Sequence, residues 1–245
     1  MGPEPSPHMP TMRAALIYLA IGSSKNYDDG ALRFCKTIRE TDPCVDFDII
    51  AMACNGVPSH TVINALDEVG ASWYPYWGEG CDIGAHQTAA NLIDHDFMIC
   101  CSSHTYFHRE GWFPRLMEAR ENLGRSLYGG MASYEQHRPH IRTNFFACDP
   151  KDFRSYPEVV NSRVKSLQFE SQPNNFLGFM QSKGMTGYLV AWDGIYGPDD
   201  YRKPGNVFRR GDQSNCLVWD RHTDIFRDAT PAQREITSAL ADGTL

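Results

Sequence analysis

The clearest pattern along the chain is a set of short, uninterrupted apolar runs, each followed by small or polar residues. The first run, AALIYLAI at 14–21, leads into Gly-Ser-Ser, as expected for a strand buried on both faces. Three further stretches rich in apolar residues follow at 46–53, 72–77 and 96–101. The pattern therefore predicts four strands in the first hundred residues, the first of them buried on both faces.

Stretches with helical spacing separate these four strands. Residues 27–40 and 83–93 repeat apolar positions every three or four residues, and 59–69 begins at Ser59, a favourable capping residue. Parallel strands need such crossover helices, so the sequence predicts an α/β fold with a mostly parallel sheet flanked by helices. Ligands of such sheets bind beyond the carboxyl ends of the strands. These ends fall at 22–24, 54–56, 78–82 and 102–109.

The pattern becomes less regular after residue 125, where Gly, Pro and aromatic residues are frequent. Short strands are expected at 126–131, 142–147 and 187–191, mixed with short helices. No repeat or linker divides the chain, which predicts one domain over 13–227 with a more irregular α+β second half. Residues 228–245 are expected to form a C-terminal tail.

Composition narrows the class of protein. The 245 residues carry a net charge of -7, which argues against a nucleic-acid partner but leaves a nucleotide ligand open. The eight cysteines form no C-x-x-C pair, and no run approaches the roughly 18 apolar residues that span a bilayer. The Pro-rich segment 1–12 lacks the apolar core of a signal peptide and is expected to be a disordered leader. We therefore expect a soluble, cytoplasmic protein with reduced thiols and no transmembrane segment.

Three common motifs of nucleotide and ester chemistry are missing from the sequence. The first strand is followed neither by G-x-G-x-x-G nor by G-x-x-x-x-G-K-[ST], and there is no G-x-S-x-G. Dinucleotide oxidoreductases, P-loop enzymes and α/β-hydrolases are therefore disfavoured.

The most informative stretch is 78–112, GEGCDIGAHQTAANLIDHDFMICCSSHTYFHREGW. A Gly-rich turn with an acid opens a helix of small residues, a buried strand follows, and F-H-R-x-G-W comes next. This order resembles the middle of small GT-A glycosyltransferases, in which a loop written N-x-G-x-D-x-G-A contacts the nucleoside. Asp82, Gly84 and Ala85 match that loop, and 107–112 matches the segment after the strand.

The resemblance extends through 139–143, 169–171 and 210–215 and covers most of 13–226. It implies a hexosyltransferase-like GT-A enzyme that moves a sugar from a nucleoside diphosphate-sugar to an acceptor hydroxyl. The acceptor would be a glycan, a glycoconjugate or a small molecule. Nucleoside contacts would come from the loops around Gly22, Asn55 and Asp82.

One departure from the GT-A pattern concerns the metal. These enzymes usually carry Asp-x-Asp where the fourth strand ends, and it holds Mg²⁺ or Mn²⁺ on the donor diphosphate. Here the strand leads into Cys-Ser-Ser-His-Thr, which includes Ser103 and His104 but no carboxylate. Either the enzyme works without a metal, or His104, His222, an acid from elsewhere and the diphosphate hold the ion. His104 or Arg109 could also offset charge on the leaving group.

The resemblance points to Glu170 as the carboxylate that takes the proton from the acceptor hydroxyl in an inverting transfer. The alternative is a solvated Glu in a loop, and a retaining transfer would need no such base.

Further substrate contacts are expected from polar and aromatic residues around the strand ends. Arg142 could bind a phosphate or carboxylate, or form a buried ion pair. The resemblance gives His222 a late donor-phosphate contact, and the loop at Trp192 could line an acceptor pocket. For His104 and His108 an ordinary structural role is the alternative. The expected substrate-binding set is Gly22, Asn55, Asp82, Ser103, His104, Arg142, Trp192, Asp212, Gln213 and His222.

Two other functions remain open at this point. One is a sugar-phosphate nucleotidyltransferase, a class that shares this type of sheet. Members of that class carry a G-x-G-T-R loop after the first strand, where this chain has Gly-Ser-Ser-Lys-Asn. A non-catalytic domain that binds a sugar nucleotide or glycan is compatible with the missing Asp-x-Asp.

Overall fold

The computed structural model describes residues 12–22, 24–41, 47–135 and 138–245. The expected leader at 1–12 falls almost wholly outside this range. The first part of the described chain alternates strand and helix, as β1 (Ala14–Ile21), α1 (Lys25–Thr41), β2 (Phe47–Cys54), α2 (His60–Glu68), β3 (Ser72–Tyr76), α3 (Cys81–Leu92), β4 (Phe97–Cys101) and α4 (Trp112–Leu123). Ser59 caps α2 by accepting a hydrogen bond from the Val62 amide at 3.4 Å, as its position before the apolar spacing predicts.

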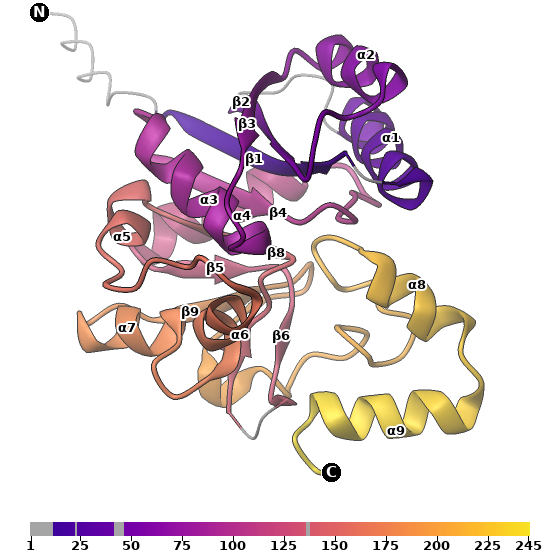
Figure 1. The fold of residues 1–245 in the computed structure, drawn as a ribbon. Helices are drawn as coiled ribbons and strands as arrows, with labels where there is room; N and C mark the ends of the chain where they lie inside the picture. The colour runs from indigo at the N-terminus through magenta and orange to yellow at the C-terminus, as the bar shows by residue number, and fades with distance from the viewer. Residues whose placement is uncertain (1–11, 23, 42–46, 136–137) are drawn as a thin grey trace, which may run out of the picture.

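The remaining elements are shorter (Figure 1). They are β5 (Leu127–Gly129), β6 (Ala132–Ser133), β7 (His140–Ile141), β8 (Phe145–Cys148), α5 (Pro150–Arg154), α6 (Arg163–Ser171), α7 (Phe176–Ser182), β9 (Gly187–Val190), β10 (Ile195–Tyr196), the 3-10 helix η2 (Pro198–Asp200), α8 (Arg221–Asp228) and α9 (Pro231–Ala241).

One eight-stranded sheet runs through the described chain in the order β10-β9-β5-β8-β4-β1-β2-β3. The strands β3, β2, β1 and β4 are parallel neighbours, and β5 is parallel to β9, while β8 runs antiparallel between β4 and β5. The prediction of an α/β fold with a mostly parallel sheet flanked by helices is confirmed. A separate two-stranded pair joins β6 and β7.

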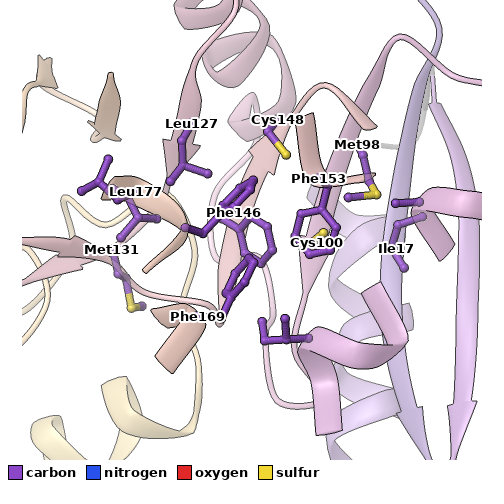
Figure 2. Close-up of a cluster of buried hydrophobic side chains, with 14 of the residues drawn as sticks. Ile17, Met98, Cys100, Leu127, Met131, Phe146, Cys148, Phe153, Phe169 and Leu177 are labelled. Carbon is purple, nitrogen blue, oxygen red and sulfur yellow. The ribbon is translucent and has the colours of Figure 1, made fainter. Parts of the chain in front are cut away.

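Both faces of β1, near the centre of the sheet, are buried, because its alternate residues enter two different apolar clusters. One cluster holds Leu16 and Tyr18 with α1, α2 and α4. The other holds Ile17 and Leu19 with α3, α5, α6 and α7, and Figure 2 shows part of it, with Phe146, Phe153 and Phe169 packed together. The helices on each face thus fix which loops meet at the carboxyl edge of the sheet.

The segment expected as a tail is largely helical. The backbone amide of Tyr134 donates to the carbonyl of Ala241 at 2.7 Å, and the Ser238 hydroxyl donates to the carbonyl of Arg209 at 2.6 Å. These bonds hold α9 against the second half of the chain. No helix in the described ranges is long and apolar enough to cross a membrane, and six cysteines lie buried there.

Candidate active site

A cleft of about 570 Å³ opens at the carboxyl ends of β1, β2, β3 and β4. The chain proceeds from β1 to β2 and β3 on one side of β1, whereas β4 pairs with its other side. The cleft therefore lies at the point where the strand order reverses, which is where doubly wound sheets bind ligands. From the second half of the chain, α6 and the start of α8 add two further walls, and Figure 1 shows these helices well apart.

The glycines at the start of α3 allow its backbone to lie close to Tyr76 and Val160. The Gly80 amide donates to the Tyr76 hydroxyl at 3.2 Å. A Cβ on Gly84 would stand 2.1 Å from the same hydroxyl oxygen and 2.6 Å from the carbonyl oxygen of Val160. Glycine at this position thus lets α3 start directly against β3 and the chain at Val160, and this places Asp82 in the cleft.

Two carboxylates face the cleft from α3 and α6. Asp82 Oδ1 accepts hydrogen bonds from the Ile83 amide at 3.0 Å and from the Ser166 hydroxyl at 3.3 Å. Glu170 Oε1 accepts from the amide of Thr143 at 3.1 Å. Burial, and then the negative charge of Glu170, raises the pKa of Asp82 to about 6. The two groups therefore form an acidic wall in which one carboxylate takes up a proton readily.

Basic side chains line the cleft as well, and Arg142, Arg221, His104 and His222 are here called its basic wall. Arg142 lines the cleft, donates to Glu135 Oε2 at 2.7 Å, and lies over the ring of Phe208 at 4.4 Å. Its Nε is buried without a hydrogen-bond partner. The expected alternative of a structural ion pair is thus present, and the residue faces the cleft as well. Arg221 lies in the same wall, and its side chain forms no hydrogen bond or ion pair with any described residue.

Two histidines lie in this wall. His104 stacks on Tyr27 with ring centroids 5.2 Å apart, and a lower pKa follows from its burial and then from the charge of Arg221. The pKa of His222 is lowered too, first by burial, although Asp220 acts in the opposite direction. Both rings are therefore mainly neutral at pH 7, and the fixed positive charge of the wall comes from its arginines.

Seven of the expected site residues line the cleft together: Asn55, Asp82, Ser103, His104, Arg142, Glu170 and His222. Gly22 lies just beside it, because a Cβ there would stand 2.7 Å from the carbonyl oxygen of Val57. Asn55 follows β2 with a φ of 55°, a left-handed conformation that Asn adopts more readily than most residues.

Three expected substrate-binding residues lie outside the cleft. Trp192 donates through Nε1 to the carbonyl of Cys216 at 2.9 Å and lies under Arg109 at 4.3 Å. Gln213 is fully buried and donates to the carbonyl of Thr223 at 3.2 Å. The exposed Asp212 accepts hydrogen bonds from Ser214 within a turn. Each of these side chains organises the local fold.

His108 has the ordinary structural role that was the alternative to a catalytic one. It stacks on Trp219 at 4.1 Å, and its Nε2 is 2.7 Å from the carbonyl oxygen of Cys216, outside the residues that line the cleft.

The cleft also includes residues of α6 and α8 that were not among the expected site residues. Arg163, Ser166 and Leu167 lie on α6, and with Glu170 they follow the spacing i, i+3, i+4 and i+7 of one helix face. Arg221 begins α8. The sequence RVKSLQFE contains this i, i+3, i+4, i+7 spacing of cleft residues. It lacks an apolar stripe, however, so the pattern does not predict a helix there.

The residues at the end of β4 do not fit a protein-held divalent ion. Ser102, Ser103 and His104 provide no carboxylate there, and hard cations such as Mg²⁺ prefer oxygen ligands. Within the described part of the chain, no group of three or more His, Cys, Asp or Glu side chains is placed to hold a metal. His104 and His222, the two expected metal-ligand candidates, lie in the cleft without such a set.

No protein-family model matches the sequence, and no curated protein does. Among solved structures, HddC from Yersinia pseudotuberculosis is similar over 60% of this chain and 82% of its own, with 14% identity and a TM-score of 0.44. The mannosyltransferase PcManGT from Pyrobaculum calidifontis, in complex with GDP-Man and Mn²⁺, covers 60% of this chain and 47% of its own, with 8% identity and a TM-score of 0.46.

Glucosyl-3-phosphoglycerate synthase from Mycobacterium tuberculosis, in complex with Mn²⁺, UDP and phosphoglyceric acid, covers 58% of this chain and 57% of its own, with 10% identity and a TM-score of 0.42. These likenesses are distant, and no ligand or activity of this chain follows from them. The chain is thus an α/β protein with distant structural similarity to glycosyltransferases and to HddC.

Proposed function

We propose that the protein is a glycosyltransferase that moves a sugar from a nucleoside diphosphate-sugar to an acceptor hydroxyl. The observation that carries this proposal is that carboxylates and basic side chains line the same cleft. Asp82 on α3 and Glu170 on α6 line it together with Arg142, Arg221, His104 and His222. A transfer of this kind needs both a proton acceptor and a cationic environment for the departing diphosphate.

In the proposed reaction Glu170 takes the proton of the acceptor hydroxyl. The acceptor oxygen forms a bond to the anomeric carbon, and the bond from that carbon to the diphosphate oxygen breaks. The leaving diphosphate carries the bonding electron pair away, and the positive charges of Arg142 and Arg221 stabilise it. The sugar is thereby transferred with inversion.

The Thr143 amide that donates to Glu170 supports this role for Glu170. A hydrogen bond to one carboxylate oxygen fixes the orientation of the group and leaves the second oxygen for the acceptor. The ends of β1, β2 and β3 and their loops provide apolar and amide groups for the nucleoside, among them Leu19, Ile21 and Asn55. No step in this scheme requires a metal ion held by the protein.

The first test is a thermal-shift screen of nucleoside diphosphates and nucleotide sugars, with Mn²⁺ and with a chelator. We expect one base to raise the melting temperature in chelator, because a ligand of the folded state stabilises it by about 2.7 kcal/mol at a hundredfold excess over Kd. A shift that appears only with Mn²⁺ would contradict metal-free binding. The absence of any shift would remove the proposed function.

The second test is the variant Glu170→Gln, assayed for sugar release from the bound donor. We expect kcat to fall by about 10² to 10⁴, the usual contribution of a general base, with nucleotide affinity unchanged. Glu121→Gln, on the exposed surface of α4, is the matched control and should retain full activity. Nucleotide binding without turnover in the unaltered protein would instead favour a non-catalytic binding domain.

A further inference from the structure

The cleft contains two arginines with no side-chain partner among the described residues, and they lie on different helices. Arg221 begins α8, and Arg163 begins α6. Neither forms a side-chain hydrogen bond or an ion pair with a described residue, whereas Arg142 in the same cleft is paired with Glu135. An unpaired guanidinium in a ligand cleft is suited to a phosphate or carboxylate, which its planar fork binds with two hydrogen bonds.

The surroundings of the two arginines differ. The charge of Arg221 lowers the pKa of both His104 and His222, so these three groups lie close to one another beside the end of β4. This cluster is the one that we assign to the donor diphosphate. Arg163 instead begins α6, which Figure 1 shows well apart from α8.

Arg163 instead shares a helix face with the proposed base. Glu170 is seven residues further along α6, and Ser166 and Leu167 lie between them on the same face. At about 1.5 Å per residue the two backbone positions are roughly 10 Å apart. Ser166 bonds to Asp82, and Leu167 is half exposed. The face therefore runs from the proposed base, past an apolar side chain, to a free cation.

We propose that the acceptor is an anionic molecule, and that Arg163 binds its phosphate or carboxylate group while the reacting hydroxyl lies at Glu170. This inference rests on the proposed function, since it places the acceptor on α6 and the donor diphosphate between β4 and α8. It makes Arg163 the residue that distinguishes charged acceptors from neutral ones.

The test measures the binding of glucose, glucose 6-phosphate and glucuronate to protein saturated with the nucleoside diphosphate found by the thermal-shift screen. We expect at least one anionic probe to bind about tenfold more tightly than glucose, the effect of one charge-assisted hydrogen-bonded pair of about 1.4 kcal/mol. The phosphate and carboxylate probes show which kind of anion is preferred.

Arg163→Met should abolish this preference while leaving nucleotide affinity unchanged, and Arg163→Lys should retain part of it because the charge remains. The matched control is Lys165→Met, which removes a positive charge from the same helix at a residue that pairs with Glu158 and does not line the cleft. Arg163 is exposed, so these variants should keep the melting temperature of the unaltered protein.

Three outcomes would overturn the inference. They are equal binding of neutral and anionic probes or no binding of either, a preference that survives Arg163→Met, and a loss of nucleotide affinity in Arg163→Met. The last outcome would assign Arg163 to the donor. If no nucleotide binds at all, the proposed function fails, and an Arg163-dependent preference measured on the free protein would still establish an anion site on α6.

Discussion

Asp82 contributes both to the charge of the cleft and to the stability of the fold. Its carboxylate is bonded to Ile83 and Ser166, so it holds the start of α3 against α6. It also faces the charge of Glu170, which together with burial raises the pKa of Asp82 to about 6 from an ordinary value of 3.8. The folded state therefore binds a proton here more tightly than the unfolded chain does.

The raised pKa of Asp82 makes the stability of the folded protein depend on pH. The ionised form of Asp82 costs stability in the folded protein, and the cost is fully present above about pH 6 and disappears below about pH 3.8. Asp82→Asn keeps the accepting oxygen and removes the charge. We expect it to raise the free energy of unfolding by about 1–2 kcal/mol at pH 7.5 and by much less at pH 4.5.

Urea unfolding at the two pH values measures this effect, with Asp67→Asn on the exposed side of α2 as the control for a lost charge. An equal gain at both pH values, or a loss of stability at pH 7.5, would show that the carboxylate is not destabilised in the fold.

Among the elements, those of the first hundred residues were predictable because their signals are local. A continuous apolar run such as β1 is readable as a buried strand, and Ser59 marks the start of α2. The carboxyl ends of parallel strands share one edge, so Asn55 and His104 could be expected to meet. Strand ends thus predict the part of the cleft that surrounds Asn55, Asp82 and His104.

The elements of the second half were harder to predict because their signals are not local. The buried residues of α6 are Phe169 and Ser171, so no apolar stripe marks this helix, and the sequence did not place Glu170 on a helix. Trp192 follows β9, which is separated from β4 by two strands that the chain order does not reveal. Asp220 caps α8 through a capping box with Thr223, a contact that only the folded helix end reveals.

The start of α3 offers a test at this scale. In Gly84→Ala the new Cβ would stand 2.1 Å from the Tyr76 hydroxyl oxygen and 2.6 Å from a backbone carbonyl, so the helix must shift away. We expect a loss of about 1–3 kcal/mol in the free energy of unfolding, partly offset by the helix preference of Ala, together with weaker nucleotide binding.

Gly197→Ala is the matched control, because a Cβ at that position meets nothing within 4 Å. A stable Gly84→Ala variant with unchanged nucleotide affinity would show that α3 does not depend on this contact.

At the scale of the whole molecule, the sheet does not form in chain order. The strand β5 lies between β8 and β9, and Leu127 in β5 pairs with Gly187 in β9. The pairings also span different lengths of chain: Ala14 in β1 pairs with Phe47 in β2 and with the more distant Phe97 in β4. Because pairings between distant segments cost more chain entropy before they form, we expect amides of β2 to become protected before those of β4 during refolding.

Pulsed hydrogen exchange with detection of individual amides measures this order. Simultaneous protection of β2 and β4 would contradict it and indicate that the sheet forms in one concerted step.

The same strand order has a consequence for synthesis on the ribosome. When β4 has emerged, its far edge has no neighbour until β8 follows more than forty residues later. That edge belongs to FMICC, a wholly apolar strand that the finished protein buries completely. An unpaired apolar edge is a template for association with other chains. The growing polypeptide therefore passes through a stage prone to aggregation, and its yield in cells should depend on chaperones that cover this edge until β8 arrives.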